Sequence, residues 1–281
     1  MLTGLDPTSG AAISAAIVVA IFLSRKAMRW MDEIAKIMGV VMIVLTLYVV
    51  IIAKPPLTEA LLRTFDPDKT DLKAIVILVG GTVGGYISFA GGHRLIDSGI
   101  SGTKALPAVT RAASGAILLA SVMRILLFLA ALGVLAGGKS PDLNNPAAAV
   151  FELAAGRSGF LIFGFVMWCA AITSVIGSAY TSVSFLKTVH PRLPSIEGKL
   201  VIAFVLVSAL IFILIGQPVK ILLAAGFING FILPFALSLM LIAVYRKKLV
   251  GDYQHPVLLT VIGILVVLLT TWMSIRAITT L

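Results

Sequence analysis

The chain has 281 residues, of which 59% are hydrophobic and only 12% are charged, and its formal net charge is +10. Soluble domains carry roughly a quarter charged residues, so this composition argues against a soluble enzyme or a soluble nucleic-acid-binding domain. It predicts an all-α integral membrane protein, with one transmembrane domain over residues 1–281 and the lipid bilayer, not nucleic acid, as its partner.

Eight apolar stretches approach the roughly 20 residues that a membrane-spanning helix needs. In chain order they lie near residues 9–24, 34–53, 74–90, 112–136, 158–186, 200–219, 221–245 and 256–277. The first is short, and only Gly216 to Lys220 separates the sixth from the seventh, which fits a tight hairpin or a kink. We therefore expect eight spans, to within one.

The third stretch contains three glycine pairs, Gly80-Gly81, Gly84-Gly85 and Gly91-Gly92. Glycine costs about 1 kcal/mol in a helix interior relative to alanine, and it adopts backbone angles that other residues resist. We predict a broken helix within residues 74–92, whose carbonyl groups line a watery cavity as in secondary transporters. The alternative is that the glycines only allow close packing between helices.

The fourth stretch carries one cation, Arg124, about twelve residues from its start. A cation at that depth costs at least about 2.5 kcal/mol unless it is paired or hydrated, so we expect Arg124 to face the protein interior. None of the eight stretches contains Asp or Glu at a matching depth. A carboxylate of the kind that neutralises a transported divalent ion is therefore absent from them.

Polar groups in the fifth and seventh stretches have two interpretations each. The hydroxyl groups of the fifth stretch, from Thr173 to Ser184, could line a hydrophilic path, but packing within the bundle is favoured. Cys169 is interpreted as a lipid-facing or packed thiol. In the seventh, the Asn229 amide could bind a cation or a neighbouring helix. Pro234 frees the carbonyl group of Gly230 and predicts a second interruption.

Basic residues alternate between the two sides of the predicted membrane domain. Thirteen lie in four connections on one side and seven in three connections on the other, so the first side is assigned to the cytoplasm and both chain ends to the outside. The three histidines lie at or beyond cytoplasmic helix ends, with spacings unlike those of metal ligands. His190 and His255 are interpreted as loop residues, whereas His93 follows the glycine-rich break and is a candidate for proton release.

Three segments resemble the natural resistance-associated macrophage protein (NRAMP) family. Residues 78–93, 174–185 and 229–236 look like its unwound sixth, hydroxyl-rich eighth and tenth helices, and the chain as a whole resembles the family from the fourth helix to the eleventh. The resemblance implies a LeuT-like fold of the amino acid, polyamine and cation (APC) superfamily, with two inverted repeats. It also implies a transporter of divalent metal cations in the plasma membrane, with bacterial relatives, no enzymatic activity and no resident cofactor.

The same resemblance implies which residues meet the cation. The carbonyl groups of Gly81 and Gly84 and the amide of Asn229 are the implied ligands, and Gly84 stands where the family usually has a methionine. Loss of that sulfur favours a harder ion such as Mn²⁺ or Mg²⁺. Candidates for a proton path or a gate are His93, Arg124 and Tyr86. Tyr86 stands where the family usually has a histidine, and this replacement argues against coupling of transport to protons.

The Asp and Asn ligands of the family's first helix have no counterpart in this sequence. We therefore expect an incomplete transporter core that needs further N-terminal helices or another chain and does not transport alone. The alternatives are an APC-superfamily transporter of an amino acid or a monovalent ion, and a non-transporting membrane subunit. A membrane-embedded enzyme is disfavoured, because the paired acids, Ser-base pairs or His clusters of such sites are lacking at membrane depth.

Overall fold

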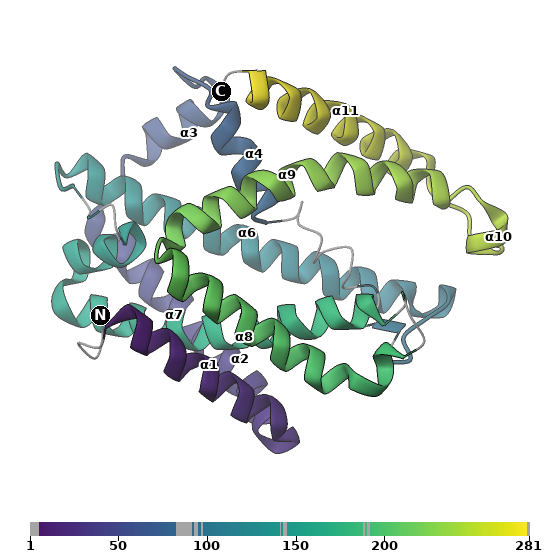
Figure 1. The fold of residues 1–281 in the computed structure, drawn as a ribbon. Helices are drawn as coiled ribbons and strands as arrows, with labels where there is room; N and C mark the ends of the chain where they lie inside the picture. The colour runs from purple at the N-terminus through teal and green to yellow at the C-terminus, as the bar shows by residue number, and fades with distance from the viewer. Residues whose placement is uncertain are drawn as a thin grey trace. The chain divides into compact units, whose positions relative to one another are not determined.

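A computed structural model of the chain describes residues 6–82, 92, 95–96, 98–140, 142, 145–187, 189 and 192–279. Every regular element in these ranges is a helix, which confirms the all-α prediction (Figure 1). The α-helices are α1 (Pro7–Leu23), α2 (Arg25–Ala53), α3 (Leu57–Phe65), α4 (Leu72–Gly80), α6 (Leu106–Ala136), α7 (Pro146–Leu186), α8 (Glu197–Ile215), α9 (Pro218–Ala243), α10 (Lys247–Val250) and α11 (Val257–Thr279). The 3₁₀ turns η1 (Thr103–Ala105) and η2 (Leu193–Ile196) precede α6 and α8.

Six of the described helices are long and apolar enough to cross a membrane, namely α2, α6, α7, α8, α9 and α11. Helix α1 is apolar but shorter, and α4 has only 9 residues. These eight helices match the eight predicted spans in order. The chain is therefore a multi-pass membrane protein, and one of its predicted spans is interrupted within the described residues.

Contacts divide the chain into two compact units. The first unit comprises Met1–Asp68, Leu106–Val183 and Arg192–Gly216, and the second comprises Lys69–Ala105, Ser184–Pro191 and Gln217–Leu281. Whether they act as the single domain predicted from the sequence stays a prediction, and each unit is described by itself.

The first unit has two packed regions. In one, α2 and α6 approach so closely that a Cβ on Gly133 would lie 2.7 Å from the Cβ of Ala53, and the fully buried Phe151 of α7 stacks on Phe163. In the other, α1 packs on α8, and the indole N–H of Trp168 on α7 donates to the Ser14 hydroxyl at 3.1 Å. Helix α7 therefore contributes to both regions, and it has the largest buried share among the described spans.

The second unit is built from α4, α9 and α11, each of which contacts the other two. Helices α9 and α11 run side by side over most of their length (Figure 1). Asp71 caps α4, because its carboxylate Oδ1 accepts the backbone N–H of Ala74 at 2.9 Å. This unit holds the residues at which the sequence predicts a cation.

Several element boundaries differ from the prediction. Helix α2 begins at Arg25, so residues 25–36 are helical where a basic connection was expected; their Arg, Lys, Met and Ala residues are good helix formers. Helix α8 ends because Gly216 adopts a left-handed conformation with φ 63°, and α9 begins two residues later. The region between these spans is thus a break between two helices.

Helix α7 contains a break that the sequence interpretation missed. Gly156 has φ 67° and ψ −163°, which divides the element into a first part and the predicted span beyond it. The prediction of an interruption at Asn229–Pro234 is wrong, because α9 continues through Pro234. Proline removes one hydrogen bond without ending a helix when the surrounding turns are held by packing, and Pro234 is buried.

Candidate functional site

Helix α4 ends where the first glycine pair begins. Its last residue is Gly80, and the N–H of Gly81 donates to the Ile77 carbonyl at 2.8 Å. The N–H and the hydroxyl group of Thr82 both donate hydrogen bonds to the Val79 carbonyl, at 3.2 Å and 3.1 Å. The chain thus tightens into a turn at this point, as the broken-helix prediction requires; residues 83–91 lie outside the described ranges.

The length of α4 sets the depth of its end. Nine residues rise about 13 Å, which is less than half of the roughly 30 Å hydrocarbon core. The helix begins after a connection that the basic-residue pattern assigns to the outside. Its C-terminal end therefore lies at membrane depth if Asp71 lies near the outer surface.

The end of α4 touches α9 through backbone atoms. A Cβ on Gly80 would lie 1.9 Å from the carbonyl oxygen of Gly226 and 2.3 Å from the amide nitrogen of Gly230. In the other direction, a Cβ on Gly230 would lie 2.7 Å from the carbonyl oxygen of Val76. Only glycine fits at these crossing positions. Gly80 therefore allows close packing between helices, as the alternative interpretation of the glycine pairs predicted, and it is also the residue at which α4 ends.

Asn229 lies beside this crossing. Gly226 and Gly230 share the face of α9 that touches α4, and a helix rotation of about 100° per residue places Asn229 at the edge of that face. Its side chain is half-buried, and no hydrogen bond joins its amide to another described residue. The predicted ligands Gly81 and Asn229 therefore belong to neighbouring segments of one packed unit, and the amide oxygen remains available.

The local electrostatics favour a cation. The C-terminal end of a helix carries a partial negative charge, because its last carbonyl groups have no partner within the helix itself. No hydrogen bond from a described residue reaches the Gly81 carbonyl oxygen. Lys73 lies at the opposite end of α4, with its ammonium group 6.0 Å from the ring centre of Phe227.

The predicted ligands at this site are neutral oxygens. Within the described ranges, no three His, Cys, Asp or Glu residues come together as a group that could hold a metal ion. What the site offers is backbone carbonyl and amide oxygen, the ligand type that suits hard cations such as Mn²⁺ and Mg²⁺.

The remaining predicted site residues are Gly84, Tyr86, His93 and Arg124. Gly84, Tyr86 and His93 lie outside the described residues. Arg124 is exposed on α6 in the first unit and has no partner among the described residues, and the expectation that it faces the interior of the protein stays a prediction. The buried residues of α6, Ala130, Gly133 and Val134, lie toward its C-terminal end, beyond Arg124.

The hydroxyl groups of α7 support the packing interpretation. The side chain of Thr181 donates to the Gly177 carbonyl at 2.7 Å, and that of Ser182 donates to Ser178 at 2.7 Å. Hydroxyl groups that are bound to carbonyl groups of their own helix have less capacity to hydrate an ion. Cys169 is buried with 6% of its surface exposed, which agrees with the packed and not the lipid-facing alternative for this thiol.

One feature of the site was overlooked at the sequence level. The pattern Gly226-x-x-x-Gly230 inside an apolar stretch is a known signal for close helix packing, and it marks where α4 meets α9. The pattern could therefore have predicted the contact face of α9 but not its partner helix.

Comparison with known proteins supplies the context for this geometry. Residues 1–280 match the family described as natural resistance-associated macrophage protein-like. An uncharacterized membrane protein of Bacillus subtilis, YcsG, is 52% identical over 280 residues, covering 100% of this chain and 69% of the relative. An uncharacterized membrane protein of Haemophilus influenzae is 48% identical over 271 residues, covering 96% of this chain and 68% of the relative.

Proposed function

Because this chain belongs to the natural resistance-associated macrophage protein-like family of metal ion transporters, we propose that it carries a divalent cation of the Mn²⁺ or Mg²⁺ class. The chain is a multi-pass protein of the bacterial plasma membrane. Membership of this family also argues against an enzymatic role.

The end of α4 at Gly80 is the observation that carries the proposal. A helix that stops within the membrane leaves carbonyl groups that lipid cannot satisfy, so they must face protein, water or an ion. At this end the neighbouring surface is the glycine face of α9, with the half-buried Asn229 beside it. A cation that sheds part of its hydration shell here would exchange water oxygens for carbonyl and amide oxygens.

The proposed ligands are the carbonyl oxygens of Gly81 and Gly84 and the side-chain oxygen of Asn229. No sulfur lies among them, which favours Mn²⁺ or Mg²⁺ over softer metals. His93 and Tyr86 are proposed to act in a proton path or a gate that follows the glycine-rich segment. Arg124 is retained as a gating candidate, in which case it needs a partner from outside its own unit.

The charge of the cation requires a further component. The eight spans contain no acid at matching depth, and a divalent ion in a low-dielectric site normally needs an opposing negative charge. We propose that a carboxylate from additional helices or from another chain completes the site. The 281-residue chain should then bind the ion weakly and should not transport it alone.

Electron paramagnetic resonance of Mn²⁺ tests the ligands directly, because the sharp signal of the hydrated ion is lost when the ion is bound. The purified chain in detergent micelles is titrated with Mn²⁺, alongside Asn229→Leu, Asn229→Asp and the matched control Ile228→Ala. Ile228 is the adjacent residue of α9 and is 64% exposed. We expect Asn229→Leu to weaken binding at least about tenfold, Asn229→Asp to retain or strengthen it, and Ile228→Ala to leave it unchanged.

Equal binding by the wild type and Asn229→Leu would contradict the assignment of Asn229. Competition by Mg²⁺ but not by amino acids is expected; displacement of Mn²⁺ by amino acids would favour the alternative APC-superfamily substrate. Uptake of radiolabelled Mn²⁺ by cells that express only this chain tests the need for an external carboxylate. Uptake above the vector control would overturn that requirement while leaving the ion class intact.

A further inference from the structure

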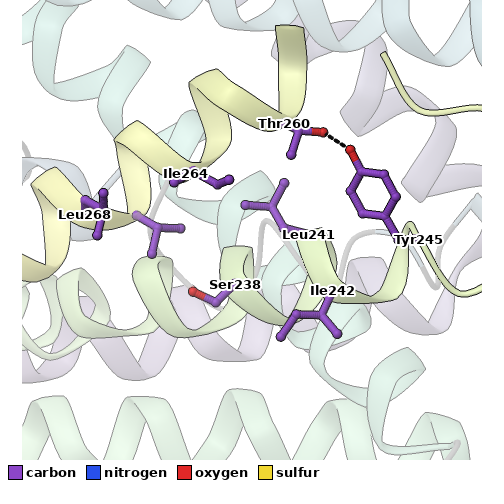
Figure 2. Close-up of a pocket in the computed structure, with 8 residues that line it drawn as sticks. Ser238, Leu241, Ile242, Tyr245, Thr260, Ile264 and Leu268 are labelled. Atoms are coloured by element: carbon purple, nitrogen blue, oxygen red, sulfur yellow. Dashed lines mark hydrogen bonds between the residues drawn. The ribbon is translucent and has the colours of Figure 1, made fainter. Parts of the chain in front are cut away.

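An apolar groove of about 480 Å³ runs between α9 and α11 in the second unit (Figure 2). Its lining residues come from one face of each helix, namely Ser238, Leu241, Ile242, Tyr245, Thr260, Ile264, Val267 and Leu268. From Thr260 to Leu268 the groove follows α11 for about 12 Å. It therefore extends from the connection between the two helices into the apolar part of the span.

One end of the groove is polar and the rest is aliphatic. The Tyr245 and Thr260 hydroxyl groups are hydrogen-bonded to each other across this end, as Figure 2 shows. The Ser238 hydroxyl donates to the carbonyl of Pro234 at 2.6 Å and so does not add a free donor at the other end. The groove thus has the polarity of an amphiphile, with a single hydrophilic end.

A basic cluster follows the polar end directly. Arg246, Lys247 and Lys248 come after Tyr245, all three are exposed, and none forms an ion pair with a described residue. The connection from residue 244 to residue 256 contains one acid, Asp252, so its net charge is +2 with His255 neutral. The basic-residue pattern assigns this connection to the cytoplasmic side, where anionic lipids attract clustered Lys and Arg residues.

We propose that this groove binds an anionic phospholipid of the cytoplasmic leaflet. One acyl chain lies along Leu241, Ile264 and Leu268, and the phosphate group meets the cationic side chains of Arg246, Lys247 and Lys248. The hydroxyl pair of Tyr245 and Thr260 lies at the boundary, where the glycerol backbone of the lipid has its ester oxygens. The proposal is independent of the cation site at α4.

The charge of the cluster identifies the occupant. Lipid surrounds a spanning helix by default, but a zwitterionic lipid gains little from three unpaired cations, whereas an anionic headgroup neutralises them. A helix from a second copy of the chain would need an apolar or acidic surface at the same height. The described connections of this chain present basic residues there, so a second copy would bring like charges together.

Native mass spectrometry of the chain with added phosphatidylglycerol or phosphatidylcholine measures how strongly each lipid binds. The first variant, Arg246→Gln/Lys247→Gln/Lys248→Gln, removes the cluster. Its matched control, Lys104→Gln/Arg111→Gln/Lys199→Gln, removes three exposed cations from other connections assigned to the same side. We expect the first variant to weaken phosphatidylglycerol binding at least about tenfold, and the control to change it less than about twofold.

A second pair of variants tests the groove itself. Ile264→Trp fills it, whereas Leu265→Trp places the same side chain on an exposed position of α11 outside it. Loss of phosphatidylglycerol binding in Ile264→Trp alone would support the proposal. Equal binding of phosphatidylcholine and phosphatidylglycerol, equal effects of the two triple variants, or a dimer that only Ile264→Trp dissociates would overturn it.

Discussion

Gly80 and Gly226 are in backbone contact: a Cβ built on Gly80 would lie only 1.9 Å from the carbonyl oxygen of Gly226. This contact joins the end of α4 to the middle of α9 and places Gly81 and Asn229, two of the predicted cation ligands, on adjoining segments. In a membrane, packing between helices depends on such close approach, because lipid removes the hydrophobic driving force. The geometry of the proposed site therefore depends on two residues that have no side chain.

Gly80→Ala should separate α4 from α9, because the added methyl group meets backbone atoms that cannot rotate away. We expect the free energy of unfolding to fall by about 1–3 kcal/mol, measured by SDS titration followed by circular dichroism. Gly115→Ala on α6 is the control, since nothing lies within 4 Å of its Cβ. An equal effect of the two variants would show that the contact is absent.

Gly156→Ala should destabilise the first unit through the backbone alone. The residue has φ 67° and ψ −163°, a region that only glycine adopts readily, and a Cβ there would meet no atom within 4 Å. A loss of about 1–3 kcal/mol in the free energy of unfolding is expected. The helical Gly177→Ala, also free of steric contact, should be neutral; an unchanged stability of Gly156→Ala would mean that α7 does not bend there.

Phe151→Ala should leave a cavity in the first unit. The ring is 1% exposed and stacks on Phe163 with centroids 4.2 Å apart. Such truncations cost about 3–5 kcal/mol in water, and we expect the lower end because the unfolded reference in lipid is also apolar. Thermal unfolding in micelles measures the loss, and the 52% exposed Phe165, changed to Ala, should show almost none.

Cysteine labelling should establish the orientation of the spans. In a Cys169→Ala background, Lys69→Cys is assigned to the outside and Lys104→Cys to the cytoplasm; both positions are exposed. A membrane-impermeant maleimide added to intact cells should label the first variant and spare the second until the cells are broken. Labelling in the reverse order would invert the topology, and with it the leaflet proposed for the anionic lipid.

The hydrophobic stretches predicted the helices well. A membrane-spanning segment must form its backbone hydrogen bonds within itself and must be apolar, so its local composition is enough to identify it. The end of α4 was predicted for the same local reason, since glycine pairs weaken a helix wherever they lie. Helix α3 was missed although Leu57, Leu61 and Phe65 give it an amphipathic pattern, because nine residues are too few to span.

Long-range features could not be read from one sequence. The pairing of Gly80 with Gly226 and Gly230 depends on which helices meet, and the sequence predicts only that small residues pack against something. The surroundings of Arg124 could not be predicted for the same reason. The free-energy cost of a cation at membrane depth predicts a polar environment, but it does not identify the element that provides this environment. Pro234 misled the prediction because the turns that surround it hold the helix together.

The central claim is that the break at Gly80–Gly81 offers a backbone carbonyl oxygen to a divalent cation beside Asn229. Electron–nuclear double resonance of bound Mn²⁺ in a chain labelled with carbonyl-¹³C glycine measures this most directly, with an unlabelled chain as the control. The account predicts a ¹³C hyperfine coupling typical of a directly bound carbonyl group, which disappears in Asn229→Leu as the ion is lost. Bound Mn²⁺ with no ¹³C coupling in the labelled chain would contradict it.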